Sequence, residues 1–481
     1  MTTPEKEIAR TWIEDHRDLI TDAHQQAWEL AEVGLQETET SRLLADILED
    51  NGFTVERGVA GMPTAFVATY GSGGPVIGVM AELDALPGLS QEAVPYLQPR
   101  KGGNAHAAGH GCGHCGYAAT ALGAALAVKA AIEAHGLPGT IKCFGCPAEE
   151  TLVGKVFMVR DGVFDGLDAC LGHHPGSANA ASLGTGVAMN SVKFEFFGKA
   201  SHAGGSPEQG ISALDAVELM NVGVNYMREH VVQETRMHYV IEEGGHEPNV
   251  VPAYARSWYY LRAPERDLVD QYYAWLLRIA DGADLMAGTT HKVRFLTGAH
   301  NSIPNHPLAE CVVANMREVG APTYTKEEEA FAAELAKSIS PEEKRAALRK
   351  SRLPDALELM DVNINQRIYD PYGEGQVSGG STDVAEVSWI TPTVEFSTAA
   401  FVVAMPGHSW QHTAVSGTSI AHKSTVFAAM VMASTALDLL TDPEILNDVH
   451  RDWKARLAGR SYTSPLPPDL NPPLDQLESQ H

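Results

Sequence analysis

The glycine-rich segment GHGCGHCG at 109–116 carries the densest group of side chains that could perform chemistry. Cys112 and His114 are two residues apart, so both can point at one ion only while the backbone is extended, before the following helix begins. A thiolate and an imidazole together suit a borderline metal ion such as zinc. A single Cys-x-His pair also occurs in ordinary loops, so a metal site needs further ligands.

Further candidate ligands follow three expected strands. Glu149 and Glu150 follow a strand expected at 140–146. Neighbouring side chains of an extended segment point opposite ways, so one carboxylate can bind a metal while the other faces a substrate. His174 and His408 each follow a further short expected strand. Because open α/β sheets bind ligands beyond the carboxyl ends of their strands, we expect these donors to converge.

A four-cysteine zinc site is the alternative, formed by two Cys-x-x-Cys pairs at 112–115 and 143–146. The spacing between the pairs is longer than that of usual zinc sites of this type. Cys143 and Cys146 also lie in one expected strand, where residues three apart point to opposite faces. Cys115 lies inside the expected helix. The spacing therefore disfavours this alternative.

The elements that must position these residues alternate between strands and helices. Helices are expected within 4–50 and at 113–135 and 153–160, and strands at 64–70, 75–81, 140–146, 168–171 and 401–404. This alternation predicts an α/β fold with a mixed, mostly parallel sheet sandwiched by helices.

The pattern changes near residue 190. Strands at 191–197, 236–243, 250–255, 256–262 and 291–296, with helices at 208–232 and 265–285, predict an inserted ferredoxin-like α+β domain. The chain thus divides into a first catalytic part at 1–190, the insert at 191–300 and a second catalytic part at 301–463. A charged, solvated helical excursion is expected at 325–360, and the Pro-rich tail at 464–481 should wrap the surface or be disordered.

Composition limits the classes of partner. The chain has 481 residues and a net charge of −26, which excludes a non-specific nucleic-acid binder. No continuous apolar run reaches the length of a membrane span, and the N-terminus has no secretory signal, so no membrane partner is expected. Six cysteines are too few for a disulfide scaffold. A reduced, cytoplasmic, multi-domain soluble protein with a large core is the resulting expectation.

Three residues of the expected insert could contact a substrate. His202 lies at a strand end in KASHAGGSP, Asn249 precedes a strand in GGHEPNVVP, and Arg262 ends a strand in YYLRAPE. An amide and a guanidinium suit a substrate carboxylate or a developing oxyanion. Each of the three could equally be an ordinary surface or turn residue.

The order of the motifs resembles the di-metal aminoacylase/carboxypeptidase family of amidohydrolases. AELDALPG, GHGCGHCG, PAEE, HHP, SHAGGSP, GGHEPNVVP, GGSTDVAEVSW and PGHSW occur in the order and spacing of that family, over roughly residues 15–460. The chain is most similar to the branch with bacterial p-aminobenzoyl-glutamate hydrolase subunits and indole-3-acetyl-amino-acid hydrolases. It departs in having Glu82-Leu83-Asp84 where better-known relatives have His-x-Asp, and in having Cys115 where Asp or Asn is common.

The resemblance implies a site of two divalent metal ions, manganese or zinc. The residues matching its metal ligands are Cys112, His114, Glu150, His174 and His408. Glu149 matches the general acid/base, and Asp84 matches a residue that orients a ligand. His202 matches a histidine that reaches the partner's active site in homodimers, while Asn249 and Arg262 match groups that hold the substrate. The same resemblance implies that the insert is a lid or dimerisation domain.

The implied reaction is hydrolysis of the amide bond of an N-acyl or N-aroyl amino acid by metal-activated water. Conjugates like p-aminobenzoyl-glutamate or indole-acetyl amino acids are the expected substrates. A dipeptidase, a carbamoyl-amino-acid hydrolase or an aromatic-amine deaminase would keep the same site. A non-catalytic subunit or peptide-binding relative is the alternative from another class, which the full set of six metal-site residues disfavours.

Overall fold

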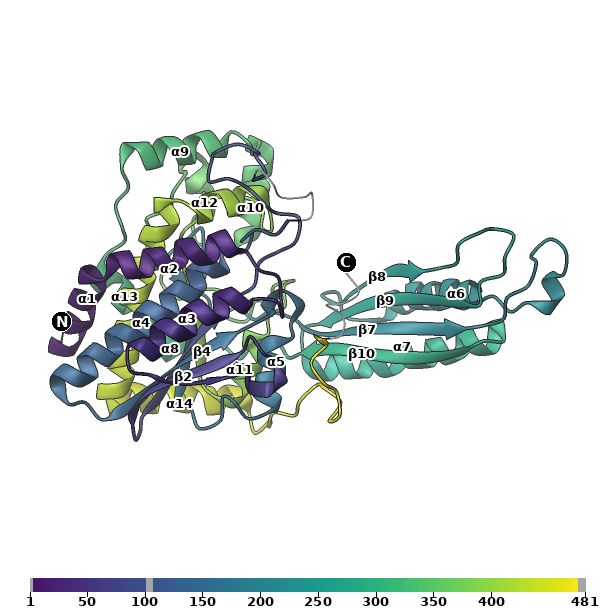
Figure 1. Ribbon diagram of the computed structural model, residues 1–481, viewed down its shortest axis with the longest axis horizontal. Helices are drawn as coiled ribbons and strands as arrows, with labels where there is room; N and C mark the ends of the chain where they lie inside the picture. Colours follow the sequence, from purple (N-terminus) through teal and green to yellow (C-terminus); the bar gives the residue numbers. More distant parts are fainter. Residues whose placement is uncertain (1–2, 101–106, 475–481) are drawn as a thin grey trace.

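The computed structural model describes residues 3–100 and 107–474, and it contains a seven-stranded and a four-stranded sheet (Figure 1). The larger sheet is mixed, and its four central strands, β4, β3, β5 and β11, run parallel. The strands in spatial order are β1 (Thr54–Arg57), β2 (Phe66–Ser72), β4 (Gly139–Cys146), β3 (Val76–Glu82), β5 (Ala169–Gly176), β11 (Thr393–Ala399) and β6 (Ala180–Ala181).

Helices cover both faces of this sheet, as the alternating pattern predicts. The core of one face is shared by α1 (Pro4–Asp15), α2 (Arg17–Leu30), α3 (Thr38–Asp50), α4 (His114–His135), α8 (His306–Val319), α13 (Ser419–Thr441) and α14 (Pro443–Leu457). The opposite face is covered by α5 (Gly154–Arg160) and α11 (Val384–Ile390). The α/β sandwich expected from the sequence is confirmed.

Two of these helices, α4 and α13, are long and apolar enough to cross a membrane by length and composition alone. In each of them, 89% of the most apolar window is buried inside the protein. They pack against one another and against the sheet, so burial in the core accounts for their apolar character.

The smaller sheet has the strand order β10-β7-β9-β8, with every pair antiparallel. Its elements along the chain are β7 (Ala188–Phe197), α6 (Ala213–Met227), β8 (Arg236–Glu243), β9 (Tyr254–Ala263), α7 (Arg266–Ala287) and β10 (Thr290–Ala299). Side chains of β9 alternate between buried and half-buried, and the buried ones share a core with α6 and α7. This β-α-β-β-α-β arrangement is ferredoxin-like. We call residues 188–299 the lid, and Figure 1 shows it projecting from the rest of the chain, which we call the body.

Three expected elements differ in the structure. A single strand, β9, replaces the strand pair expected at 250–255 and 256–262, because its side chains alternate without a break through Ala255 and Arg256. The lid helix α6 is shorter than expected, since turns of 3-10 helix flank it at Pro207–Gln209 and Arg228–His230. No strand forms at 401–404, and β11 ends at Ala399 instead.

The charged segment at 325–360 is helical but is not a purely solvated excursion. It forms α9 (Lys326–Ala336) and α10 (Pro341–Ser351), each opened by a capping box. Ala332 and Leu335 of α9 pack against the segment around Phe401, and Leu348 of α10 packs against Val403. The excursion therefore buttresses the loop that leads to His408, a contact that its charge pattern does not reveal.

The tail is partly described. Leu466 is buried in the core beneath α5, and the carbonyl of Leu470 accepts a hydrogen bond from Arg160. Residues 464–474 therefore run along the surface of the body, and 475–481 lie outside the described residues.

Candidate metal centre

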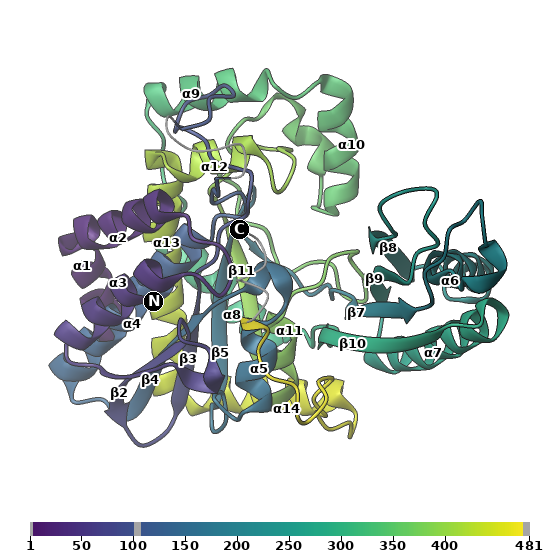
Figure 2. The same ribbon diagram turned by 45° about the vertical axis from the view of Figure 1, so that its right-hand side comes forward.

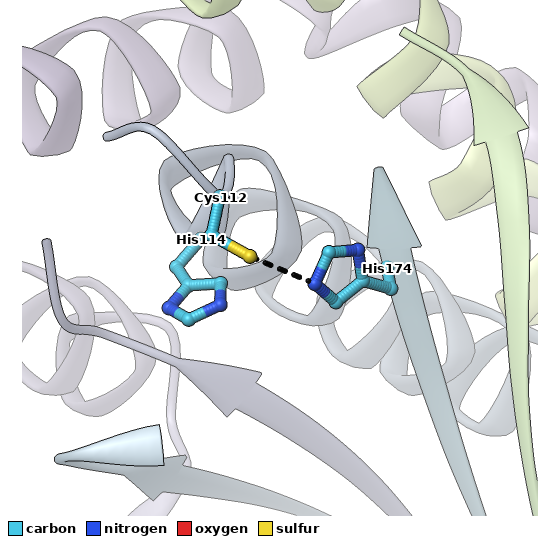
Figure 3. Close-up of side chains that lie close together, drawn as sticks. All are labelled: Cys112, His114 and His174. Atoms are coloured by element: carbon cyan, nitrogen blue, oxygen red, sulfur yellow. Dashed lines mark hydrogen bonds between the residues drawn. The ribbon is translucent and has the colours of Figure 1, made fainter. Parts of the chain in front are cut away.

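The five expected metal ligands meet at the carboxyl edge of the central parallel strands. Cys112, His114 and His174 have ligand atoms within 4.8 Å of one another, and so do Cys112, Glu150 and His408. The two groups share Cys112. Figure 3 shows the contact between Cys112 Sγ and His174 Nε2 as a dashed line. These two atoms are 3.3 Å apart, and Glu150 Oε2 lies 3.4 Å from His408 Nε2.

Local backbone conformation brings the two ligands of GHGCGHCG together. Gly113, between Cys112 and His114, has φ of 87° and immediately precedes α4. A Cβ atom at Gly113 would lie 2.8 Å from the ring of Phe401. Glycine is therefore required at position 113, both for its positive φ and because a side chain there would clash with Phe401.

His174, which was expected just beyond a strand, lies within β5, because that strand extends to Gly176.

Asp84 links two of the ligand segments. Its Oδ1 lies 3.0 Å from His114 Nδ1, and its Oδ2 accepts a hydrogen bond of 2.9 Å from the Glu150 amide. Burial acts to raise the pKa of Asp84, but the contacts with His114 and Glu150 outweigh it and hold the pKa below its usual value. Asp84 thus contacts the Nδ1 side of the His114 ring, and Nε2 of that ring faces Glu82 and Glu149.

The PAEE turn is held in an unusual conformation. Ala148 and Leu152, on either side of the short helix Glu149–Thr151, both have left-handed φ, of 53° and 57°. The buried Glu37 accepts a hydrogen bond of 2.8 Å from the Ala148 amide. Left-handed φ at a residue other than glycine costs free energy and persists only where surrounding contacts hold it. Such residues are often found at functional sites. Here it presents Glu149 and Glu150 to the cluster.

The electrostatics suit a bound cation. The nearby His174 and His114 outweigh burial and hold the pKa of Cys112 well below its usual value. The Cys112 thiolate in turn outweighs burial of the two imidazoles and raises the pKa of both. Within the described residues, Glu82 Oε2, His114 Nε2 and Glu150 Oε1 are buried without a hydrogen-bond partner. Unpartnered imidazole and carboxylate atoms beside the thiolate of Cys112 fit a divalent metal of the zinc or manganese type.

Glu149 is buried beside this cluster. Its Oε2 lies 4.0 Å from His114 Nε2, and the side chain is 11% exposed. Burial and the carboxylates of Glu82 and Asp383 raise its pKa well above the usual value. A carboxylate in such surroundings takes up a proton readily, which is the property of a general base.

Behind Glu149 lies a buried group that the sequence did not suggest. Lys155 Nζ contacts Glu82 Oε1 at 2.8 Å and Asp383 Oδ1 at 2.6 Å, and all three side chains are 0% exposed. Burial acts to lower the pKa of Lys155, but the two carboxylates raise it well above its usual value. Lys155 lies in a short apolar helix, where no pattern marks a charged role. Asp383 belongs to the GGSTD motif, whose place in the order of motifs was its only signal.

The lid residues do not join this cluster within one chain. The Ala188 end of β7 adjoins the body, because Met189, Ala299 and Leu152 share one apolar cluster. The Phe197 end lies roughly 30 Å farther along the strand. His202 and Asn249 belong to that far end, where His202 pairs with Val250 and the Asn249 carbonyl accepts from Ala203.

Arg262 lies at the opposite end of the lid, near the body. Its Nη1 donates a hydrogen bond of 3.2 Å to the carbonyl of Gly379. Of the three expected lid residues, Arg262 therefore reaches the body of its own chain through a contact with the GGSTD segment.

The four-cysteine alternative is wrong. Cys143 and Cys146 are buried on opposite faces of β4, in two different apolar clusters. Cys115 is buried against Ala27 and Trp28. Within the described residues, Cys112 is the cysteine that belongs to a metal-compatible group.

Nearby histidines have structural partners. His173 bonds to Thr120 and Thr398 through its two ring nitrogens. His412 stacks on Phe401 at 4.0 Å and bonds to the Gly111 carbonyl. His422 packs against the ring of His24 at 4.7 Å.

The fold and this site define a metal-dependent hydrolase. The family model for Peptidase family M20/M25/M40 matches residues 78–348, more than half of the chain. The chain is 37% identical over 472 residues to one of the two subunits of p-aminobenzoyl-glutamate hydrolase of Escherichia coli (strain K12), covering 96% of this chain and 97% of that protein. The chain belongs to this peptidase family and is an amidohydrolase.

Two further proteins, one compared by sequence and one by structure, are also similar to this chain. The chain is 29% identical to Xaa-Arg dipeptidase of Mus musculus, covering 82% of this chain and 79% of that protein. The crystal structure of an aminobenzoyl-glutamate utilization protein from Klebsiella pneumoniae aligns with a TM-score of 0.61 and 19% identity, covering 90% of this chain and 98% of that chain. At that identity the structural match shows the fold alone.

Proposed function

We propose that the protein hydrolyses the amide bond of N-acyl or N-aroyl amino acids, such as p-aminobenzoyl-glutamate or an indole-acetyl amino acid. The observation that supports this proposal is a buried Glu149 beside a cluster of five metal donors at the sheet edge. The Escherichia coli relative named for p-aminobenzoyl-glutamate hydrolysis, similar along nearly the whole chain, supports the choice of substrate. Release of p-aminobenzoate from p-aminobenzoyl-glutamate by the purified protein tests the proposal, and absence of release with a full metal complement would contradict it.

In the proposed reaction, Glu149 removes a proton from the attacking water and returns it to the leaving amine. Divalent metal ions, when bound by Cys112, His114, Glu150, His174 and His408, supply Lewis acidity to the carbonyl and to the water. Nδ1 of His202 accepts hydrogen bonds from the amides of Gly204 and Gly205, at 3.1 Å and 2.9 Å. Its proton is therefore on the exposed Nε2, which can stabilise an oxyanion.

The proposed centre holds two divalent ions, zinc or manganese, because the five donors form two groups that share Cys112. Elemental mass spectrometry should find about two ions per wild-type chain. Cys112→Ser should lose most of both ions, since Cys112 belongs to each group. Cys143→Ser is the matched control and should retain them, because that buried thiol lies in the core. Equal metal loss in the two variants would contradict the assignment.

We further propose that the protein works as a homodimer in which His202 and Asn249 enter the partner's site. His202 is exposed at the far end of the lid, roughly 30 Å from the body. The lid also exposes apolar side chains next to the unpaired edge of β8, with Val240 at 56%, Ile241 at 44% and Tyr226 at 73% exposure. An exposed apolar patch beside a free strand edge favours pairing with another chain. The Escherichia coli relative is named as one of two different subunits, which makes a hetero-oligomer the alternative.

Mixing two inactive variants tests this arrangement. Glu149→Gln and His202→Ala chains should each be inactive alone, whereas random re-pairing should restore roughly one quarter of the wild-type activity, because half of the symmetric dimers are hybrids with one intact site. If His202 acted within its own chain, no hybrid site would be intact. Failure to recover activity in demonstrated hybrids would contradict the proposal.

The second candidate function is a dipeptidase, favoured by the similarity to Xaa-Arg dipeptidase. Comparing kcat/KM for p-aminobenzoyl-glutamate and for a dipeptide that ends in arginine separates the two candidates.

The cytoplasm is the proposed compartment, since all six cysteines are free thiols, as suits a reducing environment.

A further inference from the structure

A cavity of about 460 Å³ lies where the GGSTD segment, the lid connections and the end of α10 meet. It is lined by Thr185 and Gly186 before the lid, by Ser302 and Pro304 after it, and by 378–382 of the GGSTD segment. The end of α10 contributes Lys350, Ser351 and Arg352. Figure 2 shows α10 on the side of the body that faces the lid. The helical segment 325–360 thus forms one wall of this cavity.

The cavity is close to the metal centre. Its floor includes Thr393, Val394 and Glu395 of β11. His174 is paired with Ser397 in the register between β5 and β11, so the floor lies two residues from the pairing partner of a metal ligand. Two strand residues span roughly 7 Å. A molecule of amino-acid size with its amide at the metal centre can therefore extend into the cavity.

Two cations line the cavity, and a third contacts one of its lining residues. Lys350 and Arg352 line the cavity, Arg352 Nη2 donates a hydrogen bond of 2.7 Å to the Val377 carbonyl, and Arg262 of the lid reaches Gly379 of the same segment. Within the described residues, no carboxylate forms an ion pair with any of the three. In a protein with a net charge of −26, three cations left without acidic partners are available for an anionic ligand.

The acidic group in the lining is already engaged. Glu395, on β11, accepts a hydrogen bond of 3.1 Å from the hydroxyl of Tyr117. The end of α10 contributes only cationic and hydroxyl side chains to the lining, and the GGSTD segment adds the hydroxyl groups of Ser378 and Ser381.

We infer that Lys350 and Arg352 bind the side-chain carboxylate of an acidic amino acid in the substrate, while Arg262 holds its α-carboxylate. This inference rests on the proposed function and narrows its substrate class to N-acyl or N-aroyl glutamate and aspartate. A guanidinium and an ammonium that approach from one wall provide charge-assisted hydrogen bonds to a carboxylate. Lys350 and Arg352 thus determine specificity and do not touch the scissile bond.

The test uses the metal-loaded, full-length protein and two matched substrates, p-aminobenzoyl-glutamate and p-aminobenzoyl-glutamine. Lys350→Gln/Arg352→Gln should lower kcat/KM for the glutamate substrate by about 10- to 100-fold, mainly through KM, as expected for lost charged hydrogen bonds. The same variant should change the glutamine substrate less than about 3-fold. Arg349→Gln is the control, because Arg349 is an exposed cation on the same helix and does not line the cavity.

Other outcomes are equally informative. Equal losses on both substrates, or an equal loss in Arg349→Gln, would overturn the inference. Inhibition of the wild type by free L-glutamate, weakened in the double variant, would support it independently of turnover. If the double variant instead lost activity on p-carboxybenzoyl-glutamine, the anion would belong to the acyl half and the assignment would be wrong. A wild type that cleaves the two p-aminobenzoyl substrates alike rejects the inference alone, whereas one that cleaves no N-aroyl amino acid rejects the proposed function.

Discussion

Glu149→Gln is expected to lower kcat for p-aminobenzoyl-glutamate by about 10²–10⁴-fold while leaving the metal content unchanged. The substitution keeps the size of the side chain and removes its ability to accept a proton. Glu149 is nearly buried beside His114 and lies outside the two groups that contain the five expected ligands, although it forms a third metal-compatible group with Glu82 and His114. Steady-state kinetics and elemental analysis on the same preparation check both halves of the prediction.

Glu150→Gln provides the contrast, because the two residues are adjacent on one strained turn. Glu150 belongs to the group with Cys112 and His408, so this variant should lose metal together with activity. If Glu149→Gln retained more than about a tenth of the activity, Glu149 would not be the general base. If it lost metal as Glu150→Gln does, Glu149 would be a ligand, as its proximity to Glu82 and His114 also allows.

The convergence of the donors was predictable because it follows from topology. Parallel strands end at the same edge of a sheet, so residues after β4 and β11 must meet near His174 whatever their separation in sequence. The split of Cys143 and Cys146 between the two faces of the sheet was predictable for a similar reason, since side chains alternate along β4. Both arguments use only the expected strands and the alternation of side chains along them, which the local sequence pattern indicates.

Features that depend on contacts between distant segments were not predictable. The charges of α10 suggest an exposed helix, yet Leu348 packs against Val403 and Lys350 and Arg352 line a cavity. The distance between His202 and the metal centre depends on how far the lid extends from the body. The ends of strands were also harder to predict than their existence. The sequence pattern of β5 does not show that the strand continues through His174, and only its pairing with β11 shows this.

The buried Lys155 is the clearest example of a feature that depends on contacts between distant segments. Its replacement has the largest expected effect on the stability of the protein. Lys155→Met removes the cation that lies between Glu82 and Asp383, so Asp383 is left buried without a counter-charge and Glu82 keeps the imidazole of His114 as its neighbour, at 3.3 Å. Removing one partner of a buried ion pair typically costs about 3–5 kcal/mol. The melting temperature of the metal-free protein should therefore fall by more than about 5 °C. Using metal-free protein separates this effect from any loss of metal binding.

Lys129→Met is the matched control, because Lys129 pairs with Glu133 at the surface, where Glu133 is 52% exposed. Exposed pairs of this kind contribute less than about 1 kcal/mol. Similar melting temperatures for the two variants would contradict a stabilising role for the buried group.

A second substitution distinguishes lost charge from lost packing. In Lys155→Met/Asp383→Asn the uncompensated charge of Asp383 is gone, so part of the lost stability should return, whereas a packing defect would persist or grow. The Lys155 amide also donates to Asp383 Oδ2, at 2.8 Å, and Asp383 begins the helix that follows the GGSTD segment. The group therefore ties that segment to Glu82 at the end of β3. Recovery of stability without recovery of kcat/KM would show that this charged link also positions the substrate wall beside the metal centre.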